Sequence, residues 1–262
     1  MTILDTIIQE KKREVTHLKN KTFEQTVYEP LQTTFAAQIK ARNTMGVIAE
    51  IKRASPSKGM INADVDPVKQ AKFYEENGAN AISILTDAPF FKGSMDDLRA
   101  VRQAVNLPIL CKDFIIDTVQ IDQAKAAGAN IILLIAAALD DESLHTLYNY
   151  ATTHQLEVIC EVNNEVEMER VLKLGATLIG VNNRDLKTFE VDLNTTSRLA
   201  HLVNNEDVIL IGESGITTPE DVRTLANAGA EAILVGETLM RAEDVGATLA
   251  SYQVDLPTES RF

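Results

Sequence analysis

Gly-Ala pairs recur at intervals of about fifty residues along the 262-residue chain, at residues 78, 128, 175 and 229. Each pair ends a stretch with helical periodicity and leads into a short run of β-branched residues. Glycine suits this place because it readily adopts the left-handed conformation that ends many helices. Fifty residues accommodate two strand-helix units, so the fourfold repeat predicts the eight units of a closed barrel.

The strands and helices expected from this pattern alternate along the chain. The predicted strands cover residues 47–52, 81–86, 109–112, 131–135, 157–161, 178–182, 208–212 and 232–236. The predicted helices cover residues 67–77, 95–104, 118–127, 142–154, 165–174, 196–203, 219–228 and 239–252. We therefore predict an α/β fold, a (β/α)8 TIM barrel with a parallel sheet. An open doubly wound sheet is the alternative, but no Gly-x-Gly-x-x-Gly motif follows the first strand.

About forty-five residues precede the first predicted strand. Thr2 and Asp5 have the spacing of a capping box, and apolar residues recur behind them at helical spacing. A second short helix is predicted over residues 33–40. We expect a single domain over residues 1–262, with residues 1–45 as an N-terminal helical extension that packs on a barrel at residues 46–255.

Composition excludes several classes of protein. The net charge of −13 disfavours a nucleic-acid binder or an acidic-membrane binder, because both partners require a basic surface. The longest apolar run, residues 131–139, is far shorter than the ~20 residues of a membrane helix. Cys111 and Cys160, the only cysteines, lie in apolar runs, which predicts buried thiols and a cytoplasmic protein. The four histidines lack ligand spacing, so we expect no metal site.

The carboxyl ends of the predicted strands carry the chemistry, because active sites of (β/α)8 barrels lie there. Glu50 and Lys52 are two residues apart and therefore share one face of the first strand. Lys112 ends the third strand and Glu161 the fifth. Two amines and two carboxylates that converge on one mouth can tune each other as proton donors and acceptors. If Lys112 and Glu161 face the barrel interior, the neighbouring cysteines face the helices and are not nucleophiles.

Glycines follow the last two predicted strands. Ser214, Gly215, Gly236 and Glu237 are predicted to form a phosphate cradle, because backbone N–H groups at glycines can approach a phosphate closely and barrel enzymes frequently bind phosphate there. Residues 55–59, rich in serine, proline and glycine, are expected to form a mobile loop that begins beside the charged pair.

Together these residues resemble the indole-3-glycerol-phosphate synthase family of tryptophan biosynthesis. The similarity covers nearly the whole chain, and its most specific parts are Glu-x-Lys-x-x-Ser-Pro-Ser at residues 50–57 and Lys-Asp-Phe at residues 112–114. Further matches lie at residues 160–162, 180–186, 213–216 and 235–237.

The resemblance implies a reaction without a cofactor. In it, 1-(2-carboxyphenylamino)-1-deoxyribulose 5-phosphate closes its ring, loses carbon dioxide and loses water to give indole-3-glycerol phosphate. By the family pattern, Lys112 is the general acid of ring closure and Glu161 the proton-transfer carboxylate. Lys52 is a second donor that anchors the substrate carboxylate, and Glu50 holds Lys52. Which of Lys52, Glu161 and Glu50 acts in dehydration stays open at this point.

The resemblance also implies residues that bind and orient the substrate. Asn182, a further catalytic residue, and Arg184 orient the hydroxyls and the carboxylate, while Ser55 and Ser214 contact the substrate. Phe91, Phe114 and Leu133 form an apolar wall for the anthranilate ring, although Leu133 fits simple packing equally well. Glu237 is acidic where some relatives carry a small hydroxyl residue, so only its backbone N–H is expected to contact phosphate.

Two other functions are possible on this fold, and the residues disfavour both. The related barrel enzyme phosphoribosylanthranilate isomerase calls for a cysteine at the end of strand one and an aspartate at the end of strand six, where this chain has residues 50–52 and Asn182. A non-enzymatic binding protein on the same fold predicts loss of the strand-end residues. We therefore expect an enzyme for a small sugar-phosphate substrate that works as a monomer or weak homodimer.

Overall fold

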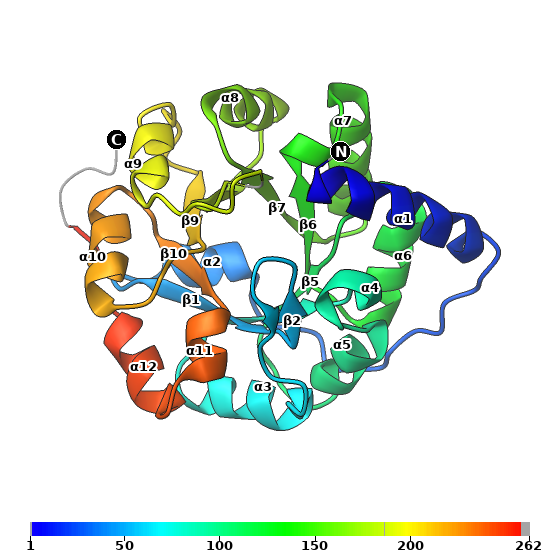
Figure 1. Ribbon diagram of the computed structural model, residues 1–262, viewed down its shortest axis with the longest axis horizontal. Coiled ribbons are helices and arrows are strands. Elements are labelled where there is room, and N and C mark those ends of the chain that lie inside the picture. The colour runs from blue at the N-terminus through cyan, green and yellow to red at the C-terminus, as the bar shows by residue number, and fades with distance from the viewer. Residues whose placement is uncertain (1, 186, 258–262) are drawn as a thin grey trace.

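Eight parallel strands close into a barrel, in the order β1-β10-β9-β8-β7-β6-β5-β4, as the fourfold repeat predicts. Figure 1 shows this barrel with helices around it in the computed structural model, which describes residues 2–185 and 187–257. The barrel strands are β1 Gly46–Ile51, β4 Ala81–Leu85, β5 Ile109–Lys112, β6 Ile131–Ile135, β7 Glu157–Val162, β8 Leu178–Asn182, β9 Ile209–Glu213 and β10 Ala232–Val235.

The helices cover the outside of the barrel and its two ends. They are α1 Ile3–Leu18, α2 Phe35–Lys40, α3 Pro67–Glu76, α4 Ala88–Phe91, α5 Met95–Arg102, α6 Thr118–Ala127, η1 Ala136–Ala138, α7 Asp141–Thr153, α8 Glu165–Leu174, α9 Asn194–Ala200, α10 Pro219–Asn227, α11 Glu237–Arg241 and α12 Val245–Tyr252. The glycines of the repeat have φ angles of 89° at Gly78, 97° at Gly128, 84° at Gly175 and 96° at Gly229. Their predicted left-handed conformation is confirmed.

Two local predictions were wrong. The expected helix at residues 239–252 is two helices, because Ala242 is extended and the side chain of Asp244 starts α12 by accepting a hydrogen bond from Ala247 N at 2.9 Å. The expected loop at residues 55–59 is instead part of an antiparallel hairpin, with β2 at Ala54–Ser55 and β3 at Gly59–Met60. A short turn inside it brings the strands together.

Alternation along the strands separates two apolar layers. Inward side chains such as Ile48, Leu110 and Ile159 fill the barrel, and outward ones, among them Cys111 and Cys160, pack beneath the helices. Burial raises the pKa of each thiol to about 12, so both stay uncharged near neutral pH. The cysteines are free, buried and turned away from the barrel interior, as predicted.

The second helix of the extension closes the amino-terminal end of the barrel. Phe35 and Ile39 of α2 are fully buried and join the apolar cluster inside the barrel. The first residue of β7, Glu157, accepts hydrogen bonds from Phe35 N at 2.7 Å and Ala36 N at 2.8 Å. Because α2 carries bulky side chains into the barrel, it acts as an apolar plug.

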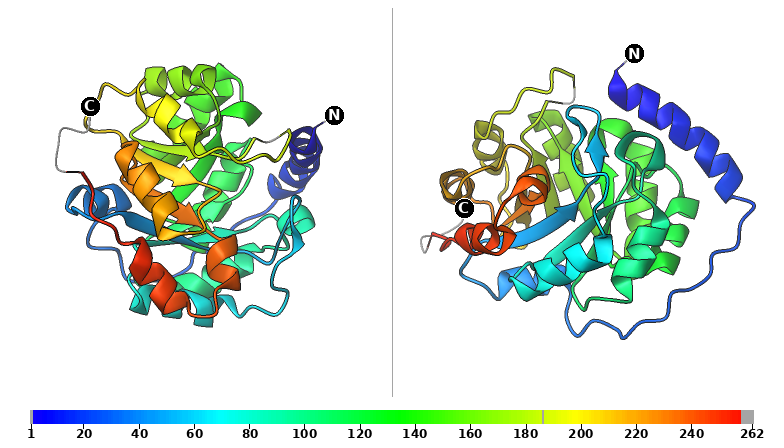
Figure 2. Two further views of the ribbon diagram at one scale, coloured as in Figure 1. Left: turned by 60° about the vertical axis from the view of Figure 1, so that its left-hand side comes forward. Right: turned by 60° about the horizontal axis from the view of Figure 1, so that its bottom comes forward.

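The first helix lies at the opposite end, beside the carboxyl ends of the strands. Thr2 and Asp5 form the predicted capping box at its start, and α1 packs against α6 and η1. The connection to α2 runs along the outside of the barrel (Figure 2), where Thr26 N donates to Ala126 O of α6 at 2.7 Å. Among the described residues, no helix combines the length and apolar character needed to cross a membrane.

Candidate active site

A cavity of about 780 Å³ opens at the carboxyl ends of the strands. Its walls come from strand ends, the β2–β3 hairpin and α1. The structure brings together here every site residue expected from the sequence: Glu50, Lys52, Ser55, Phe91, Lys112, Phe114, Leu133, Glu161, Asn182, Arg184, Ser214, Gly215, Gly236 and Glu237.

The charged pair at the end of β1 lies on one side of this cavity. Lys52 Nζ is 2.6 Å from Glu50 Oε1, so the two side chains share a face as alternation predicted. Ser83 of β4 donates to the buried Glu50 carboxylate at 3.4 Å. Burial alone would raise the pKa of Glu50, but the nearby ammonium groups, first that of Lys52, outweigh it and hold this pKa below its ordinary value.

A second charged group surrounds Lys112 at the end of β5. Its Nζ lies 2.5 Å from Glu213 Oε2 and 3.7 Å from Glu161 Oε2, and Asn182 Nδ2 donates to Glu161 Oε1 at 3.0 Å. Burial disfavours the ammonium, but the surrounding carboxylates, Glu213 foremost, outweigh it and raise the pKa of Lys112. Lys112 is therefore a stable cation next to two carboxylates.

Glu213 is not among the site residues predicted from the sequence. Its position suggests only that it belongs to the glycine-rich end of its strand. The sequence does indicate that this side chain points into the barrel, because Glu213 continues the inward alternation of Ile209 and Ile211 along β9. Gly180 of β8 makes room for it, since a Cβ there would lie 2.2 Å from Glu213 Oε1.

In the two charged groups around Lys52 and Lys112, carboxylates outnumber ammonium groups. Glu50, Glu161 and Glu213 face the two ammonium groups of Lys52 and Lys112. Burial raises the pKa of Glu213 to about 7, against the opposing attraction of Lys112. The set can therefore hold or release a proton near neutral pH, as acid-base chemistry requires.

Two aromatic rings line the same cavity and form an aromatic wall. The ring centroids of Phe91, at the end of α4, and Phe114, after β5, are 5.9 Å apart, with an angle of 37° between the ring planes. Leu133 of β6 is buried in the cluster that fills the barrel. An apolar ring could lie against this wall with its polar substituents toward the lysines.

The ends of β9 and β10 form the wall of the cavity next to β1, which pairs with β10. Ser214 and Gly215 have φ angles of 65° and 79°, so a sharp turn follows β9 directly. A Cβ at Gly236 would lie 2.4 Å from Glu50 Oε1 and 3.1 Å from Lys52 Nζ, so a larger residue there would displace the charged pair. The Glu237 carboxylate is held by Arg241 at 3.2 Å, with Lys58 at 3.8 Å.

Arg184 lines the cavity but also holds its own loop. Its Nη1 donates to Phe189 O at 3.0 Å, and its backbone N donates to Asn182 Oδ1 at 3.0 Å. On the hairpin side, Arg53 contacts both carboxylate oxygens of Asp97 in α5, at 2.5 and 3.2 Å. Both loops that flank the mouth are thus fixed by an arginine.

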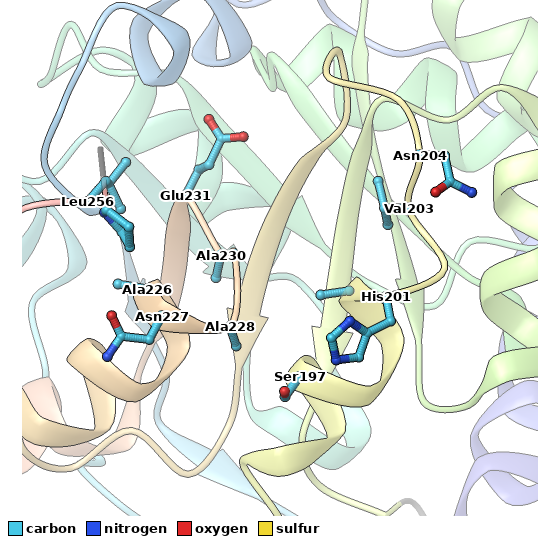
Figure 3. Close-up of a pocket in the computed structure, with 13 residues that line it drawn as sticks. Ser197, His201, Val203, Asn204, Ala226, Asn227, Ala228, Ala230, Glu231 and Leu256 are labelled. Carbon is cyan, nitrogen blue, oxygen red and sulfur yellow. The ribbon is translucent and has the colours of Figure 1, made fainter. Parts of the chain in front are cut away.

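A second cavity, of about 320 Å³, lies at the other end of the strands (Figure 3). Ser197 of α9 and His201, directly after α9, border it, together with Leu256 near the carboxyl end of the described chain. The buried Glu231, whose carboxylate lies 3.3 Å from Lys40, also lines it. Its lining contains none of the expected site residues. Among the described residues, no cluster of three or more His, Cys, Asp or Glu side chains is arranged to hold a metal ion.

Comparison with solved structures supports the fold. The crystal structure of a 3-hexulose-6-phosphate synthase superimposes with a TM-score of 0.64 over 79% of this chain and 98% of that one. The two sequences are only 18% identical, so this likeness concerns the barrel alone.

Sequence comparison is far more specific. The family model described as indole-3-glycerol phosphate synthase matches residues 4–252. The indole-3-glycerol phosphate synthase of Oceanobacillus iheyensis is 50% identical over 99% of this chain and 100% of its own length. That of Exiguobacterium sibiricum is 52% identical over 93% of this chain and 94% of its own. The chain therefore belongs to the indole-3-glycerol phosphate synthase family, the carboxy-lyases of tryptophan biosynthesis.

Proposed function

We propose that the cavity at the carboxyl ends of the strands converts 1-(2-carboxyphenylamino)-1-deoxyribulose 5-phosphate to indole-3-glycerol phosphate. The observation that carries this proposal is the pair of charged groups at the mouth, Lys112 between Glu213 and Glu161 and Lys52 beside Glu50. They supply proton donors and acceptors in one cavity, which the aromatic wall also lines.

Ring closure begins the reaction. The aromatic carbon that bears the carboxylate attacks the ketone carbon, and negative charge develops on the ketone oxygen. Lys112 donates a proton to that oxygen, because its raised pKa keeps it charged and the new alkoxide is a stronger base than an amine. Glu213, 2.5 Å away, fixes the direction of the ammonium and is a positioning residue.

Loss of carbon dioxide and water completes the indole. Carbon dioxide then leaves from the aromatic carbon that attacked the ketone, and the electron pair of the broken bond returns to the ring. One group must then protonate the departing hydroxyl while another removes a proton from the ring that forms. We assign the acceptor role to Glu161, oriented by Asn182 at 3.0 Å, and the donor role to Lys52, held by Glu50 at 2.6 Å.

The remaining cavity residues bind the two ends of the substrate. Phe91, Phe114 and Leu133 hold the anthranilate ring, while Lys52 and Arg184 attract its carboxylate before it leaves. Ser55 lines the hairpin side of the cavity, within reach of the ribulose chain.

The phosphate belongs on the opposite side. Backbone N–H groups at Ser214, Gly215, Gly236 and Glu237 surround it, and Ser214 adds its hydroxyl. The Glu237 carboxylate takes no part because Arg241 and Lys58 hold it and because it would repel a dianion.

We also propose that one domain and one subunit suffice, so that the enzyme works as a monomer or weak homodimer in the cytoplasm. Every residue given a role above comes from one barrel in one chain. No second chain is needed to complete the site.

Replacement of the general acid tests the assignment. Lys112→Met should lower kcat by about 10²–10⁴-fold, while the Kd of the substrate changes by less than about fivefold, because the aromatic wall and phosphate cradle are intact. Lys125→Met, on the outer face of α6, is the control and should retain parental turnover. Near-parental turnover of folded Lys112→Met would contradict the role. If the parental protein binds the substrate without turnover, the mouth is a binding site only.

A further inference from the structure

A fully buried lysine lies outside the reaction chemistry described above. Lys11 of α1 has an exposed fraction of only 1%. Its Nζ is 2.6 Å from Asp113 Oδ1, 3.1 Å from Asp87 Oδ2 and 2.8 Å from Glu14 Oε2. Lysine is almost never buried to this degree unless it is paired, so the site was built around the charge.

The two buried aspartates belong to the loops that carry the aromatic wall. Asp87 follows β4, and its Oδ1 accepts hydrogen bonds from Phe90 N at 2.8 Å and Phe91 N at 3.2 Å, which starts α4. Asp113 follows β5, and its Oδ1 accepts from Phe114 N at 2.8 Å. Each aspartate therefore sets the backbone position of one ring of the wall.

The helix that supplies Lys11 is itself part of the cavity. Ile3, Leu4 and Ile7 of α1 line it, and α1 packs beside α6 and η1 on this side of the barrel (Figure 1). Lys11 is thus the point where the extension, the β4–α4 loop and the end of β5 meet. Without its charge, two buried carboxylates would face each other unpaired, which is strongly unfavourable.

We propose that Lys11 is a positioning residue for substrate binding, whose ammonium joins α1 to both loops and holds Phe91 and Phe114 at the separation that the anthranilate ring requires. This inference rests on the proposed function, because it takes these rings as the anthranilate site. It gives the extension a role in the reaction beyond packing.

The test compares two lysines that each join the extension to the chain segment after β5. Lys11→Met removes the buried charge and keeps the length of the side chain. Lys19→Met is the matched control, because Lys19 directly follows α1 and pairs at 2.7 Å with Asp117 after β5, but its side chain is 57% exposed. Steady-state turnover gives kcat and KM for the substrate, and inhibition by inorganic phosphate gives a Ki that reports on the phosphate cradle alone.

For Lys11→Met we expect KM to rise about tenfold, with kcat within about threefold of the parental value and the Ki of phosphate unchanged. A purely structural role would change KM and the phosphate Ki together or change neither. Lys19→Met should leave all three values unchanged. An unchanged KM in folded Lys11→Met, or a parallel rise in the phosphate Ki, would overturn the proposal.

A second variant covers the case in which Lys11→Met does not fold. Asp87→Asn keeps the oxygen that starts α4 but removes the charge facing Lys11, so KM should rise with the phosphate Ki unchanged, and an unchanged KM would count against the proposal. Turnover by the parental protein separates the two claims. If the parental protein turns over and neither variant raises KM, the role of Lys11 fails and the proposed function stands. A parental protein without turnover would remove the basis of both.

Discussion

Glu213 illustrates how neighbours set the chemistry of a residue. Its carboxylate lies in the barrel mouth 2.5 Å from Lys112 Nζ, and a second carboxylate, that of Glu161, lies 3.7 Å from the same ammonium. Gly180 leaves the space that its carboxylate occupies. An ordinary glutamate at this place would be fully ionised at neutral pH, whereas burial brings its pKa to about 7.

This shift predicts a pH dependence of stability. The folded-state pKa of about 7 exceeds the ordinary 4.5, so the folded protein binds the proton more tightly than the unfolded chain. The contribution of this protonation to the free energy of unfolding is complete below about pH 4.5 and is lost as the pH rises through 7. The free energy of unfolding of the parental protein, minus that of Glu213→Gln, should fall by about 3 kcal/mol over this range. Urea unfolding at a series of pH values measures it, and a difference that is constant or rises with pH would contradict the shift.

Gly236, like Gly180, leaves room for charged side chains beside it. Its φ of −119° suits any residue, so only the missing side chain explains the glycine. In Gly236→Ala the new methyl group must displace Glu50 or Lys52, and we expect kcat/KM to fall about 10–100-fold, which corresponds to about 1.4–2.7 kcal/mol.

Glu237→Ala is the matched control for this variant. Only the backbone N–H of Glu237 is assigned to the phosphate, and its carboxylate would repel a dianion. Glu237→Ala should therefore leave KM unchanged or lower it. Steady-state kinetics of the two variants decide the point. If kcat/KM fell equally in both variants, any substitution in this loop would be harmful. The effect of Gly236→Ala could then not be assigned to a clash with Glu50 or Lys52.

At the scale of elements, the two helices of the extension divide the work. The plug α2 closes the amino-terminal end of the barrel, far from the chemistry, while α1 contacts the loops of the mouth. A change in α2 should therefore alter stability, and a change in α1 should alter substrate binding.

The plug gives a prediction about stability. Phe35 is fully buried inside the barrel, so Phe35→Ala leaves a cavity and should lower the free energy of unfolding by about 3–5 kcal/mol. Phe73→Ala on α3 is the control, because that ring is 42% exposed. It should lower the free energy of unfolding by well under half of the loss in Phe35→Ala. Chemical unfolding measures both. Below its unfolding transition, Phe35→Ala should keep the parental kcat, and a large loss of kcat in the folded variant would contradict the separation of roles.

At the scale of the whole molecule, the barrel could be predicted from sequence because the Gly-Ala repeat depends on the backbone conformation of single residues. Each glycine of the repeat adopts a left-handed conformation at a helix end, which one residue type signals by itself. The strand ends then indicate one mouth, and the residues expected there line a single cavity. Their individual roles stay predictions until variants are measured.

What the sequence did not reveal depends on contacts between distant segments. Lys11 looked like one more charge on an amphipathic helix, because its partners Asp87 and Asp113 lie far along the chain. The hairpin at residues 54–60 is anchored through Arg53 to a helix after the next strand. Local sequence patterns do not show such pairings, so the role proposed for the extension rests on the fold.

The central claim is that the mouth of this barrel makes indole-3-glycerol phosphate with its own side chains. The most direct test incubates the purified protein with 1-(2-carboxyphenylamino)-1-deoxyribulose 5-phosphate and a metal chelator, without added cofactor, and follows indole fluorescence. We predict a signal that rises at a rate proportional to protein concentration and is unaffected by the chelator. A folded protein that binds the substrate but produces no indole signal would contradict the claim.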